Sequence, residues 1–265
     1  MKKKLTIVVC IKQVRDQEAH SSFVEIDTKH LKVTAEGVSQ VLNPLDESAL
    51  ELALRIKDNH PGTKIIVVGT GNKMSDAIMI KSLAVGADEL VLIDSQEMQL
   101  DTGTTPLVLA EAIKMFEFDL VLTGLQAADT NAGCTGLALS ELLGIPAASW
   151  ARNIEIDDHG IVVERITADG FQVLKGLMPA LVTVSFEAGN IRSAKVTAMR
   201  DARKKPIRYL SLGDLNLKLD SAYSCIQLES SSNRVRECKF LEGDSTEELA
   251  AKLKSTLIHQ GFLEI

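Results

Sequence analysis

The sequence has few aromatic residues for its length of 265, and this limits the kind of core that it can build. Phe, Trp and Tyr together make up 4% of the chain, whereas the hydrophobic residues as a whole make up 45%. Such a core has to be built mainly from Ile, Val, Leu and Ala. The length suffices for one large α/β domain, or for one domain with an appendage.

Cysteine is scarce as well, since only Cys10, Cys134, Cys225 and Cys238 occur. No two of them have C-x-x-C spacing, and no histidine stands at ligand spacing from any of them. This pattern argues against a zinc site and against a disulfide framework. A reducing compartment is the simplest interpretation.

Long apolar runs are also missing. No run approaches the roughly 20 residues that a membrane-spanning helix needs. The first run, Leu5–Ile11, is short and ends at Lys12 without a small-residue cleavage site, which favours a buried strand over a secretion signal. The net charge of -7 argues against nonspecific nucleic-acid binding by the whole chain. We therefore expect a cytoplasmic protein with no membrane insertion and no nucleic-acid partner.

Motifs of common nucleotide enzymes and hydrolases are lacking too. G-x-x-x-x-G-K-[ST] occurs nowhere, which excludes a P-loop ATPase at the level of the motif. Gly69-Thr70-Gly71-Asn72 begins like a dinucleotide fingerprint, but position 74 is Met where the last glycine is required. There is no G-x-S-x-G elbow and no evident nucleophile–base pair, so we expect no catalytic residues and no metal site.

Residues 1–145 alternate short apolar segments with amphipathic ones. The expected strands are Leu5–Ile11, Lys64–Gly69, Leu90–Asp94 and Leu120–Thr123. The expected helices begin at Asn43-Pro44, span residues 75–85 and 105–116, and follow Gly133 to end at residues 144–146. Continuous apolar strands alternating with helices predict a doubly wound, mostly parallel, Rossmann-like sheet. Ligands of such sheets bind beyond the carboxyl ends of the strands, where the strand order reverses.

The second part of the chain has another pattern. A hairpin insertion is expected from 23–26 and 31–34, and further strands from 153–156, 161–167, 171–174 and 181–186. The apolar signal then falls over residues 187–208, which are rich in Lys and Arg; a solvated linker is one interpretation, and we expect an arm that leaves the globule. Ser230–Ser232 indicates a loop, and Ser245 with Glu248 predicts a capping box for a last helix over 246–257. The expected domains are therefore an α/β domain, 1–186, and an extended C-terminal arm, 187–265.

Residues 123–136 are the most informative stretch for function. They directly follow a strand, precede a helix, and are rich in small and hydrogen-bonding residues. Backbone N–H groups at a helix start, together with the helix dipole, form a phosphate site. Asp129 and Asn131 can bind ribose hydroxyls or cap the turn. Nucleotide binding and an ordinary strand-to-helix loop both remain open on this pattern alone.

Six segments, in matching order over roughly residues 5–215, are similar to the beta subunit of electron transfer flavoproteins. They are Ile11–Asp16, Asn43–Ala49, Leu83–Asp88, Gly124–Gly136, Val163–Arg165 with Leu177–Val184, and Ala202–Ile207. The resemblance implies an electron carrier subunit, not an enzyme, that forms a heterodimer with an alpha subunit holding the exchanging FAD. It would carry electrons between a flavin-dependent dehydrogenase of the acyl-CoA type and another redox partner.

The resemblance also implies residue roles. An AMP bound in this subunit would contact Cys10, Asn43, Pro44, Leu45, Asp46, Thr70, Gly124, Gln126, Ala127, Asp129, Asn131, Ala132, Gly133, Cys134 and Thr135. A recognition loop, 187–208, would dock on the dehydrogenase through Arg192, Lys195, Val196, Met199 and Arg200. The remaining C-terminal arm would wrap the alpha subunit.

The chain departs from the family pattern at several positions. Cys134 replaces a glutamine, Asn131 replaces an aspartate, and Ala188–Ser193 replaces L-N-E-P-R-Y. Two alternatives therefore stay beside the AMP-binding carrier. One is an electron-bifurcating member with FAD in this subunit, and the other is a stand-alone adenine-nucleotide sensor.

Overall fold

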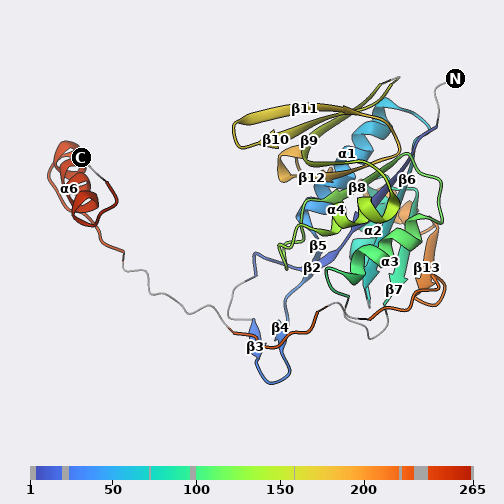
Figure 1. Ribbon diagram of the computed structural model, residues 1–265, viewed down its shortest axis with the longest axis horizontal. Helices are drawn as coiled ribbons and strands as arrows, with labels where there is room; N and C mark the ends of the chain where they lie inside the picture. Colours follow the sequence, from blue (N-terminus) through green and yellow to red (C-terminus); the bar gives the residue numbers. More distant parts are fainter. Residues whose placement is uncertain are drawn as a thin grey trace. The chain divides into compact units, whose positions relative to one another are not determined.

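Short apolar strands and amphipathic helices alternate in the first part of the chain, as the sequence indicates (Figure 1). The computed structural model describes residues 4–19, 24–71, 73–95, 100–157, 159–220, 223–229 and 238–263. Contacts divide the chain into two units, residues 1–227 and 228–265. The expected boundary at residue 187 therefore does not coincide with the boundary between the compact units.

The centre of the first unit is a nine-stranded sheet. Its strands are β1 (Thr6–Ile11), β6 (Lys64–Gly71), β7 (Glu89–Asp94), β8 (Leu120–Gly124), β9 (Ala147–Asp157), β10 (Gly160–Thr167), β11 (Gly170–Gly176), β12 (Ala180–Val184) and β13 (Ile207–Ser211). Their order is β11-β10-β9-β12-β8-β1-β6-β7-β13. Pairing is antiparallel between β9, β10 and β11, and parallel from β9 through β12 to β13. The predicted mostly parallel sheet is thus confirmed.

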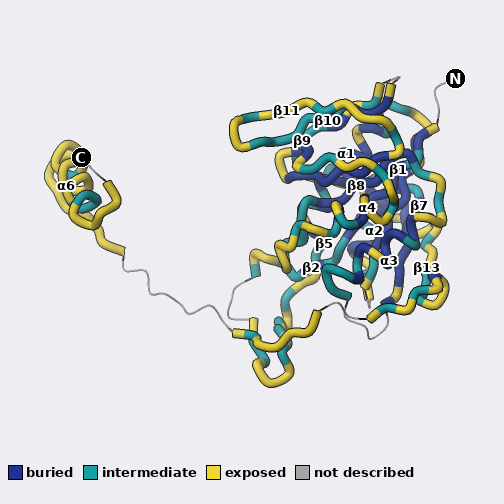
Figure 2. Tube along the Cα trace, viewed as in Figure 1, coloured by how far each residue is buried: buried dark blue, intermediate teal, exposed yellow. Residues whose placement is uncertain are grey.

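Four helices cover the two faces of this sheet. They are α1 (Pro44–Asn59), α2 (Asp76–Ala84), α3 (Thr104–Ile113) and α4 (Thr135–Leu143). Side chains of α1 and α2 share one apolar cluster with Val9 and Val67, whereas those of α3 and α4 share a second cluster with Val8 and Val68. Because neighbouring strand residues point to opposite faces, the two clusters lie on opposite sides of the sheet. The doubly wound architecture is confirmed, and Figure 2 shows the central strands as buried segments.

The hairpin insertion is present as two short antiparallel strands, β3 (Glu25–Asp27) and β4 (Lys32–Thr34). Phe23, where the hairpin was expected to start, lies outside the described residues. A second small sheet pairs β2 (Gln13–Arg15) with β5 (Gln40–Leu42), which brings the segment after β1 to the start of α1.

Residues 187–208 differ from the expected arm, because they return to the sheet. After the short helix η2 (Phe186–Ala188), α5 (Val196–Ala202) lies against α2, and β13 pairs in parallel with β7. Ala188 and Ala202 are buried in the core. These two alanines, spaced among charged residues, are too small to raise the apolar signal of the segment, which is why composition favoured an arm.

The second unit contains α6 (Thr246–His259), two residues longer than expected at its C-terminal end. Ser245 Oγ accepts a hydrogen bond from Glu248 N at 3.2 Å, as a capping box requires. The Glu248 carboxylate, however, accepts from Asp244 N at 3.0 Å and not from Ser245 N, so half of the predicted box forms. The serine run at 230–232 lies outside the described residues. In the part of the chain that is described, we find no helix with the length and apolarity to cross a bilayer.

Candidate functional site

The strand order reverses at β1. The chain runs from β1 through β6 to β7 on one side, and then returns to place β8 and β12 on the other. In doubly wound sheets the ligand crevice lies beyond the carboxyl ends of the strands at such a reversal. Cys10 and Gly124 lie near those ends of β1 and β8, respectively. The predicted site residues therefore fall where the topology predicts a ligand.

Asn43 connects the start of α1 with the loop after β8. Its Nδ2 donates to Gln126 O at 3.0 Å, and its Oδ1 accepts from Ala128 N at 3.0 Å. Its own backbone N–H donates to Lys12 O at 2.9 Å. The Asn43 side chain makes no capping bond within α1, although it stands at the N-cap position, because both ends of its amide hold the loop.

Asp46 joins the ends of the two strands beneath the loop. Its carboxylate accepts from Lys12 N at 2.7 Å and from Gly124 N at 3.1 Å. Burial raises the pKa of Asp46 to about 7, although hydrogen bonds from Asn43, Lys12 and Gly124 act in the opposite direction. Gly124 is needed here, because a Cβ would come within 2.8 Å of Leu45 C and 2.9 Å of Asp46 N.

The loop between β8 and α4 is ordered by contacts of its own polar residues. Gln126 Nε2 donates to Asn131 Oδ1 at 3.1 Å, and Lys12 Nζ pairs with Asp129 Oδ1 at 2.7 Å. Asn131 and Gly133 have positive φ values of 50° and 64°, so the backbone turns sharply before the helix. Lys12 was not among the predicted contacts, although its place directly after β1 was a usable signal.

The start of α4 offers hydrogen-bond donors. The first N–H groups of a helix have no acceptor within it, and the N-cap residue Cys134 makes no side-chain capping bond. The preceding residues Ala132 and Gly133 are small, which allows a ligand to approach the backbone closely. Together with the helix dipole, these features suit a phosphate group.

Two further predicted contacts, Cys10 and Thr70, border the same edge. Thr70 lies on β6, and its hydroxyl donates to Ile93 O at 3.3 Å. Cys10 is a buried free thiol, and burial together with the nearby Asp46 carboxylate raises its pKa. A thiol that stays protonated is a poor nucleophile, so Cys10 is suited to lining a site and not to covalent chemistry.

The predicted docking residues divide into two groups. Val196 is 84% exposed and Met199 44% exposed on α5, with Lys195 and Arg200 beside them. Arg192 is engaged within the protein, where it pairs with Glu51 and Asp58 of α1.

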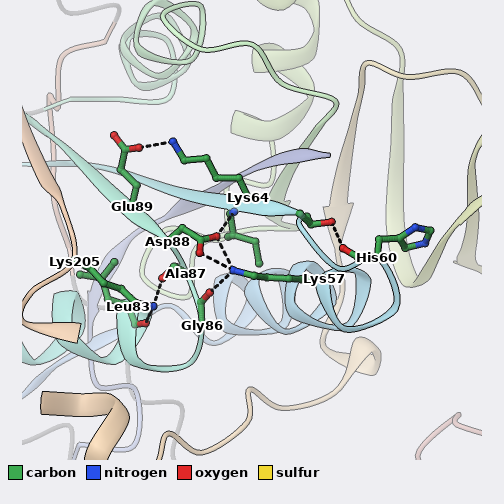
Figure 3. Close-up of polar contacts among 11 residues, drawn as sticks. Lys57, His60, Lys64, Leu83, Gly86, Ala87, Asp88, Glu89 and Lys205 are labelled. Atoms are coloured by element: carbon green, nitrogen blue, oxygen red, sulfur yellow. Dashed lines mark hydrogen bonds and ion pairs between the residues drawn. The ribbon is translucent and has the colours of Figure 1, made fainter. Parts of the chain in front are cut away.

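Two of the six family-like segments contact each other (Figure 3). Lys205 Nζ donates to Leu83 O at 2.8 Å and to Ala87 O at 2.5 Å. Asp88 accepts from Lys57 Nζ at 2.6 Å and from Ile65 N at 2.8 Å. These contacts close the turn after α2 and join it to β6 and to the segment before β13. Their role in the described structure is architectural.

The fold and the edge define a class: a doubly wound α/β protein with a phosphate-suited loop at the strand reversal. Comparison with known proteins narrows this class. The family described as "Electron transfer flavoprotein domain" matches residues 30–215. The "Caffeyl-CoA reductase-Etf complex subunit CarD" of Acetobacterium woodii is 36% identical over 215 residues, 80% of either chain.

Several relatives carry the name "Electron transfer flavoprotein subunit beta", and two of them show the range of similarity. The protein from Thermoanaerobacterium thermosaccharolyticum is 33% identical over 80% of this chain and 81% of its own. The protein from Homo sapiens is 29% identical over 95% of this chain and 97% of its own. The chain therefore belongs to the electron transfer flavoprotein family, as a beta subunit, and its function is electron transfer.

Proposed function

We propose that this chain holds an AMP and forms a heterodimer with an alpha subunit that carries the exchanging FAD. Electrons would pass between a flavin-dependent dehydrogenase of the acyl-CoA type and another redox partner. One observation carries the proposal: Asn43 and Asp46 form hydrogen bonds with the 124–135 loop at the reversal of strand order. That arrangement builds a rigid binding edge, and no nucleophile–base pair is apparent in it.

The residues of this edge fit an adenine mononucleotide. The N–H groups from Asn131 to Thr135 would hold the phosphate at the start of α4. Asp129 and Asn131 would bind ribose hydroxyls, and Cys10, Thr70 and the Asn43–Asp46 turn would border the rest. Such a nucleotide would join β1, β8 and α4 through one ligand, and would stabilise the fold by mass action.

Two exposed apolar regions of this chain are suited to binding partner proteins. Val196 and Met199 project from α5 beside Lys195 and Arg200, which suits docking on a protein surface with acidic groups. In the second unit, α6 has no buried residue; its Leu253 is 48% exposed, and Phe262, just after the helix, is 73% exposed. A helix with uncovered apolar side chains is suited to packing on a partner, for which we propose the alpha subunit.

One alternative is a bifurcating role with FAD bound in this subunit. It is favoured by the 36% identical relative, whose name places it in a caffeyl-CoA reductase complex. All four cysteines are free thiols, which supports a reducing compartment such as the cytoplasm for either role.

Cofactor content tests the proposal. The chain would be co-purified with its alpha partner, its nucleotides released with acid, and FAD and AMP quantified per heterodimer by chromatography. One FAD and one AMP are expected. Two FAD and no AMP would instead make this subunit a redox centre, and failure to co-purify with any flavoprotein would overturn the carrier role.

A matched pair of variants tests whether the AMP is bound in this chain. Gly124→Ala forces a Cβ into the backbone of Leu45 and Asp46, and is expected to lower AMP content without lowering FAD. Gly213→Ala places its Cβ 3.5 Å from Ser211 Oγ, an ordinary contact, and serves as the control. Equal AMP in both variants would contradict the assignment.

A further inference from the structure

The segment before α5, the proposed docking helix, is attached to α1 by one buried carboxylate. Glu51 is 5% exposed. Its Oε2 accepts from Arg192 N at 3.0 Å and from Arg192 Nε at 3.0 Å, and its Oε1 accepts from Arg192 Nη2 at 3.0 Å. One carboxylate therefore holds both the backbone and the guanidinium of the same residue.

Further groups of α1 complete this attachment. Arg55 Nε donates to Glu51 Oε1 at 3.2 Å, and Asp58 Oδ2 lies 2.8 Å from Arg192 Nη2. Burial by itself would raise the pKa of Glu51, but the hydrogen bonds from Arg192 and Arg55 outweigh it and lower the pKa. Arg–carboxylate contacts with paired hydrogen bonds are among the strongest and most directional in proteins.

A second attachment lies at the other end of the docking helix. Lys205 Nζ donates to two carbonyls at the C-terminal turn of α2, and Pro206 O accepts from Leu90 N at 3.1 Å as β13 begins. Ala202, in the last turn of α5, is fully buried. The helix is thus fixed before and after, while Val196 between the two attachments is exposed.

From this arrangement we infer that Arg192 is a positioning residue, which together with Glu51 holds α5 as a preformed docking surface instead of contacting the partner itself. The inference rests on the proposed docking role of Val196. A preformed surface avoids the ordering cost that a mobile loop pays on binding, and this favours fast association. The side chain of Arg192 is already used by Glu51 and Asp58, so it is not available as a free cation for a partner.

A substitution of Glu51 distinguishes a positioning role of Arg192 from direct contact of Arg192 with the partner. Because Glu51 is buried, it cannot touch a partner, and its substitution acts through the two residues that it holds, Arg192 and, more weakly, Arg55. Glu51→Gln removes the charge and keeps the shape. If Arg192 positions the helix, Glu51→Gln weakens docking about as much as Arg192→Met does. If Arg192 contacts the partner directly, Glu51→Gln leaves docking unchanged or strengthens it.

The experiment uses the heterodimer as electron acceptor of a purified acyl-CoA dehydrogenase. We expect both variants to raise the KM for the heterodimer roughly five- to tenfold, a change typical of interface side chains, with kcat within about twofold. Hydrogen exchange of residues 190–204 should speed up in both, with AMP content unchanged. Glu111→Gln, which breaks the exposed pair with Lys114 on α3, is the control and should change neither quantity.

Two further variants distinguish a failure of the proposed docking role from a failure of the attachment by Arg192. Val196→Ala tests docking itself, and an unchanged KM in this variant would overturn the proposed docking role while hydrogen exchange still tests the attachment. Asp58→Asn removes a 60% exposed partner of Arg192, cannot collapse the core, and should raise exchange and KM by about twofold. Wild-type exchange and wild-type KM in both Glu51→Gln and Asp58→Asn would overturn the inference.

Discussion

The carboxylate of Asp46 accepts a hydrogen bond from the backbone N–H of Gly124 at 3.1 Å, although 78 positions separate the two residues. Its other oxygen accepts from Lys12 N at 2.7 Å. One buried side chain of α1 thus joins the carboxyl ends of β1 and β8, the two strands that border the reversal of strand order. The shape of the proposed nucleotide edge depends on this carboxylate.

Asp46 makes stability depend on pH. Its pKa is raised from 3.8 to about 7, so the folded state binds a proton that the unfolded chain has released. Stability from this group is complete below the unfolded pKa and is lost as pH rises through the folded pKa. We expect the free energy of unfolding of nucleotide-free protein to fall by about 2 kcal/mol from pH 5 to pH 7 through Asp46. Urea unfolding at several pH values measures the slope.

Asp46→Asn should flatten that slope, because an amide does not titrate. Glu36→Gln, which changes an exposed carboxyl in the turn after β4, should leave it as in the wild type. If Asp46→Asn keeps the wild-type slope, the pH dependence arises elsewhere.

Gly124→Ala should destabilise the protein as well as the site. The added Cβ meets backbone atoms of α1, which cannot move without shifting the whole helix, and overpacking of this kind costs about 1–3 kcal/mol. Thermal unfolding is the measurement, with Gly213→Ala as control. A melting temperature of Gly124→Ala within error of the control would mean that the edge adapts more easily than its contacts indicate.

Cys134 should report nucleotide binding through its reactivity. It is exposed at the N-cap of α4, where the proposed phosphate would lie, whereas Cys10 is buried. Alkylation by iodoacetamide, followed by mass spectrometry, should modify Cys134 in nucleotide-free protein and spare it when AMP is bound. The exposed Cys225 and Cys238 are internal controls and should react in both states. Equal labelling of Cys134 with and without AMP would place the nucleotide elsewhere.

Lys205→Met should destabilise the protein, whereas Lys204→Met should not. Lys205 donates to two backbone carbonyls, and Met provides no donor for them. The loss should lower the free energy of unfolding by about 1–3 kcal/mol. Burial, together with the neighbouring Lys57, also lowers the pKa of Lys205, while Asp88 opposes this. The side chain of Lys204 is 76% exposed and pairs with nearby Asp201. Chemical unfolding of the two variants, which lie side by side in sequence, compares them directly.

Much of the fold could be predicted because its strands are short and continuously apolar. β1, β6, β7 and β8 lie close to their predicted ranges, and the strand-to-helix loop after β8 was recognised by its small and polar residues. Because these strands are buried on both faces of the sheet, nearly all of their residues are apolar, and composition alone indicates them. The position of a ligand edge then follows from topology.

Residues 187–211 could not be predicted in the same way. Their return to the sheet depends on a few buried alanines, on the Glu51–Arg192 contact across 141 positions, and on parallel pairing with β7. Local charge cannot show whether an arginine faces solvent or a carboxylate of a distant helix. The internal engagement of Arg192 therefore needed three-dimensional information.

The parallel pairing of β13 with β7 has a consequence for biosynthesis. A chain leaves the ribosome N-terminus first, so β7 emerges long before Ile207, which pairs with Leu90. Until then one side of β7 has unpaired backbone groups, a condition that invites wrong association. The helix α5 shortly precedes β13, so β7 gains its second neighbour and the proposed docking helix is fixed in the same late step. Nascent chains, or chains truncated before β13, would therefore not display the proposed docking surface.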